Sequence, residues 1–171
     1  TFKLTDEKRE VISHLKQIIL QNEMFQNHAK YILEKGSMYL IYNHNLLFHA
    51  AIPLLEDGQF AKFQIDGKYY SGKALMDKFD RVVRSAYYHR YDLTNLEKDY
   101  FIYLWQGRYS PLFAKDSMKT FERYFVNDKL LHKEAKNPYF KLRIRDDVIQ
   151  RIYTEFELSE NKILFSFLFI F

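Results

Sequence analysis

The chain has 171 residues and a net charge of +4, which is enough length for one ordinary domain and only mildly basic. Aromatic residues make up 18% of the chain, and this excludes an intrinsically disordered protein. The absence of cysteine excludes disulfide scaffolds, thiolate zinc sites and cysteine nucleophiles, and it is compatible with a cytoplasmic protein.

The first element expected is a helix. Apolar residues recur at helical spacing between Thr5, which can cap the N-terminus, and Gly36, which can end the helix. We therefore expect one helix across this segment.

Two β-hairpins are expected next. Both consist of β-prone runs that flank a tight polar turn. The first turn is Asn43-His44-Asn45, between strands at residues 38–42 and 46–49, and the second is Asp66-Gly67, between strands at residues 60–65 and 68–71.

The rest of the chain is expected to be mostly helical. Thr94 and Glu97 match a capping box, and Asn137-Pro138 should end a weak helix. The expected helices span residues 73–90, 94–105, 117–126, 129–136 and 146–157. The predicted fold class is therefore α+β, with two hairpins and a mostly helical C-terminal half.

The C-terminal tail is unusual. Residues 163–171 read ILFSFLFIF, an uncharged run that is too short to span a membrane, which takes about 20 apolar residues. Such a run is typical of a buried terminal strand or of a segment that was never selected as a terminus. We favour the second interpretation.

Two short motifs suggest phosphate chemistry but have simpler explanations. Residues 67–74 read GKYYSGKA, which is one residue short of a P-loop, and Tyr69 and Tyr70 fill the loop. Residues 77–81 read DKFDR, like a two-metal phosphoesterase motif, but they lie within a predicted helix. An ion pair one turn apart, such as Asp80–Arg84, explains these charges.

His49 is the best single candidate for a ligand-binding residue. It ends an apolar strand and precedes two alanines, a position typical of a histidine that binds a metal or a phosphate. The alternative is a partly buried, hydrogen-bonded histidine with a structural role. One histidine does not make a metal site, since a catalytic cation needs at least three protein ligands.

Three ordered blocks of sequence resemble a known family. They comprise residues 39–49 with 52–54 and 56–58, residues 104–105 with 107–113 and 115–116, and residues 120–125 with 132–134 and 136–139. With these blocks, the chain from about residue 1 to residue 160 resembles the class 3 fructose-1,6-bisphosphatases, a bacterial branch of the calcineurin-like metallophosphoesterases.

The resemblance implies a fold, an activity and a cofactor. It implies part of a metallophosphoesterase α/β sandwich and Mn²⁺-dependent hydrolysis of fructose 1,6-bisphosphate to fructose 6-phosphate and phosphate in gluconeogenesis. His49 matches one ligand of the family's two-metal centre. The intact enzyme would be cytoplasmic, would bind a sugar bisphosphate and could form a homo-oligomer; no nucleic acid or membrane partner is expected.

The substrate's second phosphate needs donors beyond the metal centre. Residues 101–151 hold 11 Lys or Arg against 6 Asp or Glu, so this region is the basic one. The candidates there are Arg108, Lys115, Lys119 and Arg123. A solvated surface role is the alternative for these four residues.

The departures from the family are equally informative. The family's aspartate and histidine metal motifs should precede this segment, and a Gly-His motif should follow residue 160, but none is present. Ala50-Ala51 stand where the family has Gly-Cys. We therefore expect residues 1–160 to be one partial domain of a longer enzyme, inactive in isolation, with residues 161–171 as a tail that a shifted reading frame would explain.

A different class of function also fits the composition. A basic, aromatic module could bind a phosphorylated ligand or single-stranded nucleic acid by stacking and charge. No RNP-like or KH-like motif is present.

Poor solubility is the first testable prediction. The apolar tail and uncovered strand edges should cause the purified chain to associate. Size-exclusion chromatography and thermal melting check this, and a soluble monomer that melts cooperatively would contradict it.

Overall fold

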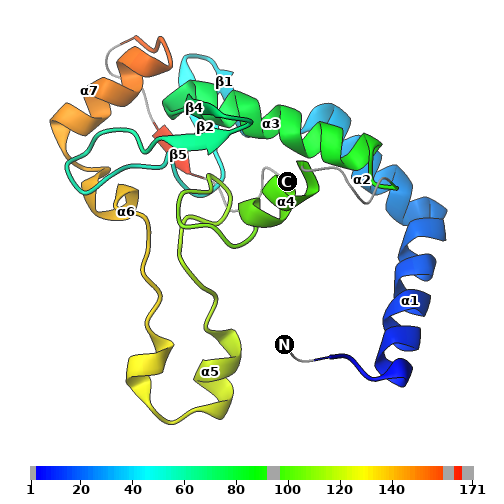
Figure 1. Cartoon of the computed structure of the whole chain (residues 1–171). Coiled ribbons are helices and arrows are strands. Elements are labelled where there is room, and N and C mark those ends of the chain that lie inside the picture. Colours follow the sequence, from blue (N-terminus) through cyan, green and yellow to red (C-terminus); the bar gives the residue numbers. More distant parts are fainter. Residues whose placement is uncertain (1–2, 92–96, 160–163, 167–171) are drawn as a thin grey trace. The chain divides into compact units, whose positions relative to one another are not determined.

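The computed structural model describes residues 3–91, 97–159 and 164–166 (Figure 1). The chain forms two compact units, Thr1–Gly36 and Ser37–Phe171. The partial domain expected over residues 1–160 stays a prediction.

The first unit consists of two helices, α1 (Asp6–Gln21) and α2 (Glu23–Lys35). Thr5 caps α1 as expected, since its hydroxyl accepts from the Lys8 N–H. The prediction of a single long helix was wrong, because the chain leaves helical geometry at Asn22. Its side-chain oxygen accepts from the Phe25 N–H at 2.8 Å and so starts a second helix.

Neither helix of this unit buries a residue. Apolar side chains at helical spacing, such as Val11, Leu15 and Ile18, remain about half exposed. The helices of this unit therefore contribute no buried core.

The second unit begins with the first predicted hairpin. Strand β1 (Tyr39–Tyr42) pairs antiparallel with β2 (Asn45–Phe48). Asn43 and His44 both have positive φ, which suits the tight turns that match strand twist. Strand β5 (Leu164–Ser166) lies parallel to β2, with Leu46 opposite Leu164.

The second hairpin also forms where it was predicted, with shorter strands. Strand β3 (Phe63–Ile65) pairs antiparallel with β4 (Lys68–Tyr70) around Asp66-Gly67, and both turn residues have positive φ. Gly67 is thus a hairpin residue rather than part of a phosphate loop. Helix α3 (Gly72–Tyr88) follows directly.

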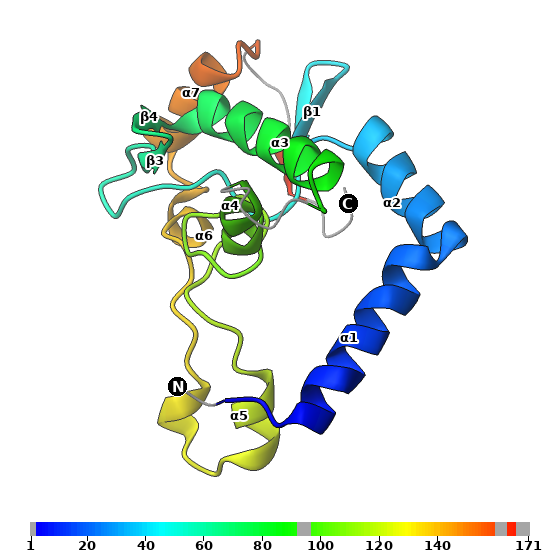
Figure 2. The same cartoon turned by 45° about the vertical axis from the view of Figure 1, so that its right-hand side comes forward.

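Helix α3 provides much of the buried core. Its inward face carries seven buried residues: Gly72, Leu75, Met76, Phe79, Val82, Val83 and Ala86. Helix α4 (Glu97–Leu104) packs against it (Figure 2). The ring centroids of Phe63 and Tyr103 lie 4.5 Å apart, so the second hairpin joins the same apolar cluster. The expected cap at Thr94 lies outside the described residues.

The C-terminal half is helical but more broken than expected. Helix α5 (Thr120–Phe125) starts three residues later than predicted, and the weak helix is a single 3₁₀ turn, η1 (Lys129–His132). The prediction missed the short helix α6 (Tyr139–Leu142) after Pro138. Helix α7 (Asp146–Glu155) forms as expected.

The fold class is therefore α+β and mostly helical, as predicted. The metallophosphoesterase sandwich stays a prediction. No helix within residues 3–91, 97–159 and 164–166 combines the length and the apolar composition that crossing a bilayer requires.

A buried asparagine links distant segments of the second unit. The Asn137 side-chain oxygen accepts from the N–H groups of Leu54 (3.0 Å) and Tyr139 (2.9 Å). Its amide nitrogen donates to the Arg108 carbonyl, and its backbone N–H donates to the Ala114 carbonyl. Because buried polar groups must be satisfied, this one residue fixes three loops together.

Replacing Asn137 with alanine should therefore destabilise the second unit. Asn137→Ala leaves two buried N–H groups and one carbonyl without their side-chain partner, which costs about 1–3 kcal/mol of unfolding free energy. Urea unfolding followed by circular dichroism measures this loss. Asn127→Ala, at an exposed position, is the matched control and should change little; equal effects from both variants would refute the role of Asn137.

Candidate functional site

His49 lies directly after β2, where the sequence placed it. Phe48 before it is fully buried, whereas His49 itself is half-buried. The N–H groups of Ala50 and Ala51 both donate to the Pro111 carbonyl, at 3.2 and 3.3 Å. The loop after His49 is therefore held against the loop that contains Arg108.

The environment of His49 favours the neutral imidazole. Burial lowers the pKa of His49, because desolvation disfavours the charged ring. The neutral ring is the form that binds a metal. However, the described part of the chain contains no group of three His, Asp or Glu side chains arranged to hold a metal ion. These residues by themselves do not fit a metal centre.

The backbone of Arg108 is fixed, because its carbonyl accepts a hydrogen bond from the Asn137 side chain. Its side chain is held less firmly. Its guanidinium pairs with Glu56 at 3.2 Å, but both side chains are substantially exposed, so this pair is weak. Its Nε atom is buried and has no hydrogen-bond partner among the described residues. Because the buried Nε is out of reach of solvent, an anion would have to bind the exposed end of the guanidinium in place of Glu56.

The other three predicted cations come together, but around a carboxylate. Glu134 accepts from the Lys115 ammonium at 2.9 Å and the Lys119 N–H at 2.8 Å, and the Arg123 guanidinium lies 3.4 Å away. The Glu134 side chain is only 7% exposed. The Lys119 ammonium pairs with Glu122. The sequence analysis singled out these three cations but did not identify the carboxylate that they surround, and their binding of a phosphate stays a prediction.

The electrostatics of this cluster follow from its contacts. The Lys119 N–H and the Lys115 ammonium hold the pKa of Glu134 below its ordinary value of 4.5. The ionised carboxylate in turn compensates the charges of Lys115 and Arg123, while Glu122 pairs with the Lys119 ammonium. A signal for this was available in the sequence, since Glu134 is the one acid between residues 129 and 136.

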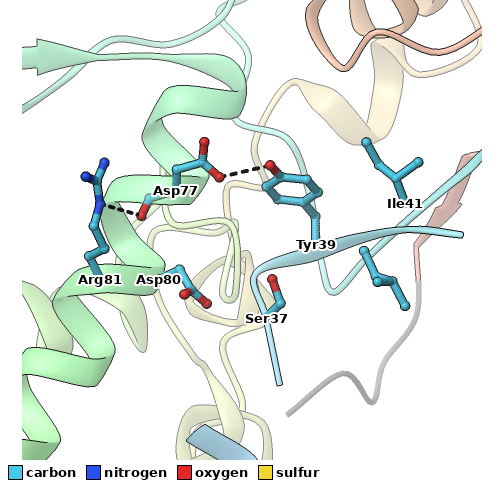
Figure 3. Close-up of a pocket in the computed structure, with 7 residues that line it drawn as sticks. Ser37, Tyr39, Ile41, Asp77, Asp80 and Arg81 are labelled. Carbon is cyan, nitrogen blue, oxygen red and sulfur yellow. Dashed lines mark hydrogen bonds between the residues drawn. The ribbon is translucent and has the colours of Figure 1, made fainter. Parts of the chain in front are cut away.

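An open pocket of about 590 Å³ lies elsewhere in the second unit (Figure 3). The Tyr39 hydroxyl points at Asp77 across it and donates to its carboxylate at 2.9 Å. Burial and this bond raise the pKa of Tyr39 to about 12. The pocket is lined by Ser37, Tyr39, Leu40, Ile41, Asp77, Asp80 and Arg81.

The pocket contains none of the predicted site residues. Asp77, Asp80 and Arg81 belong to the DKFDR motif, and the Asp80–Arg84 ion pair expected there forms at 2.8 Å. That explanation of the motif is confirmed. The pocket itself was not predicted.

Comparison with known proteins decides the family. A family model described as "Firmicute fructose-1,6-bisphosphatase" matches residues 1–165. The chain belongs to this family of fructose-1,6-bisphosphatases. The resemblance drawn from the three sequence blocks is therefore confirmed, and the alternative of a separate binding module gains no support.

Individual relatives carry the name fructose-1,6-bisphosphatase class 3. The chain is 48% identical to that of Fusobacterium nucleatum subsp. nucleatum over 159 residues, which is 92% of this chain and 25% of that protein. It is 47% identical to that of Clostridium tetani over 163 residues, 94% of this chain and 25% of that protein. It is 46% identical to that of Streptococcus agalactiae serotype Ia over 158 residues, which is 92% of this chain and 25% of that protein.

The chain thus spans about a quarter of the length of the curated fructose-1,6-bisphosphatases that it matches. No solved structure matches the chain.

The Glu134 cluster yields a stability prediction. Glu134→Ala removes the acceptor shared by Lys115 and Lys119 and should cost about 1–3 kcal/mol of unfolding free energy at pH 7. Denaturant titration measures this cost. Glu10→Ala, on the exposed face of α1, is the control and should be near neutral.

The stabilisation that Glu134 gives the fold should depend on pH. Because its pKa is lowered in the folded chain, this stabilisation is fully present above the ordinary value of 4.5 and is lost as the pH falls through the folded-state pKa. The stability gap between the wild-type chain and Glu134→Gln should therefore shrink below pH 4.5. A gap that is constant from pH 7 to pH 3 would contradict the assignment.

Proposed function

We propose that the chain forms one quarter of a class 3 fructose-1,6-bisphosphatase and supplies phosphate-binding groups and one metal ligand to the site of that enzyme. The observation that carries this proposal is the family match over residues 1–165, together with relatives of that name at 46–48% identity. The reaction is hydrolysis of fructose 1,6-bisphosphate to fructose 6-phosphate and phosphate, a gluconeogenic step in the cytoplasm.

His49 is the proposed metal ligand, with Mn²⁺ as the proposed ion. Support comes from its position at a strand end, from the burial that lowers its pKa and so favours the neutral ring, and from the two hydrogen bonds that anchor the loop after it. A metal pair in the intact enzyme would activate water and stabilise charge on the transferred phosphoryl group. The remaining ligands would have to come from outside the described residues.

Arg108 is the proposed primary contact for the substrate's second phosphate. Its guanidinium is partly exposed, and its pairing with Glu56 is weak enough for a phosphate to replace that carboxylate. Lys115, Lys119 and Arg123 are proposed to contribute more weakly, because Glu134 and Glu122 already neutralise much of their charge.

The chain by itself should be inactive. Since the described residues offer no set of three ligands, the purified chain should release no phosphate from fructose 1,6-bisphosphate with Mn²⁺ present. A colorimetric phosphate assay measures this. Mn²⁺-dependent release well above the blank would refute the proposed division of the site.

The role of Arg108 is tested in a chimera. The chain replaces the matching segment of the Fusobacterium nucleatum enzyme, and phosphate release is assayed. In an active chimera, Arg108→Gln should raise KM roughly tenfold to a hundredfold with little change in kcat, because it removes a charge-assisted hydrogen bond. Arg143→Gln, at an exposed arginine, is the control. An unchanged KM would overturn the assignment of Arg108.

A further inference from the structure

The segment of residues 117–136, here called the α5–η1 arm, has its polar and apolar groups in unusual places. Its central carboxylate, Glu134, is 7% exposed and lies within a cluster of ion pairs. Its aromatic side chains are in contrast exposed: Phe121 by 75%, Tyr124 by 80% and Phe125 by 80%. One carboxylate is thus sheltered while large aromatic side chains face solvent.

The aromatic side chains share one face of α5. Phe121 and Phe125 lie one helical turn apart, and their rings stack with centroids 6.5 Å apart at an angle of 17°. Tyr124 lies three residues after Phe121 and so projects from the same side. We call Phe121, Tyr124 and Phe125 the aromatic face of α5.

This face is held in place from the other side of the arm. Lys119, which precedes the first residue of α5, donates its N–H to Glu134. Arg123, within α5, pairs with the same carboxylate through its guanidinium. Helix α5 also packs against η1, where Leu130 and Leu131 are exposed as well. The aromatic face is therefore presented on an anchored helix.

Exposed aromatic clusters of this kind mark interaction surfaces. Large apolar patches are rare on soluble monomers, and tyrosine and phenylalanine are enriched at interface centres. The arm also exposes charges of both signs, among them Asp128, Lys129 and Lys133, so its charge by itself selects no partner. A partner surface should therefore be apolar where it meets the aromatic face.

The comparisons indicate what covers this face. The matched relatives are about four times longer than the segment they share with this chain. Three quarters of the family polypeptide thus lies outside that segment and is available to pack against it. We propose that the aromatic face of α5 is the docking surface for the part of a class 3 fructose-1,6-bisphosphatase that lies outside the matched segment.

The experiment uses the full chain and a defined partner. The partner is the Fusobacterium nucleatum enzyme from which the matched 159-residue segment has been deleted, co-expressed with the tagged chain. Size-exclusion chromatography with light scattering should show a 1:1 complex. The triple variant Phe121→Ser/Tyr124→Ser/Phe125→Ser should weaken the complex at least tenfold.

The control is Ile144→Ser, which removes an apolar group of 80% exposure outside the arm and should leave binding unchanged. Equal binding by the wild-type chain and the triple variant would overturn the proposal. A dimer of the wild-type chain that the triple variant abolishes would also overturn it, because the occupant would then be a second copy.

A second measurement does not depend on the folding of the deleted partner. Amide hydrogen exchange is compared between α5 in the isolated chain and the matching segment of the intact Fusobacterium nucleatum enzyme. Exchange should be at least tenfold slower in the intact enzyme, and equal rates would overturn the proposal. Neither measurement uses catalysis, so an inactive complex would count against the proposed function but not against this docking surface.

Discussion

Asn137 holds three loops of the second unit in register, and the candidate site residues depend on those loops. Its buried amide joins Leu54, Arg108 and Tyr139, so no one of these segments can shift without leaving a polar group unsatisfied. The Pro111 carbonyl then fixes the loop after His49 to the Arg108 loop. Hydrogen bonds thus hold two of the five predicted site residues, His49 and Arg108, on neighbouring segments.

Glu134 organises the other three in a comparable way. It accepts from the Lys115 ammonium and the Lys119 N–H and pairs with the Arg123 guanidinium, while Glu122 pairs with the Lys119 ammonium. The same cluster anchors α5, whose aromatic residues face solvent. The proposed phosphate contacts and the proposed docking surface for the rest of the enzyme would therefore share one structural element, and a change at Glu134 would affect both.

The elements with strong local signals were predictable. Asn43-His44 and Asp66-Gly67 adopt the positive φ that tight hairpins require, and α3 has a regular apolar face. The break at Asn22 and the helix after Pro138 were missed. At Asn22 the apolar spacing continues across the break, so periodicity alone gives no sign of it. The helix after Pro138 is only four residues long, too short to show a periodic pattern.

In the candidate site, too, the sequence showed some features and the tertiary structure others. Ordered strings of residues were enough to recognise the family, because long ordered matches are far more specific than single motifs. Arg108, Lys115 and Arg123 stand within those strings. Tertiary structure alone decided which anion each cation meets. Glu134 lies 19 residues from Lys115 along the chain, and only the antiparallel approach of Lys115 to Lys136 brings the two side chains within 2.9 Å. An ion pair depends on distance in space, and residue spacing fixes that distance only within a single helix or hairpin.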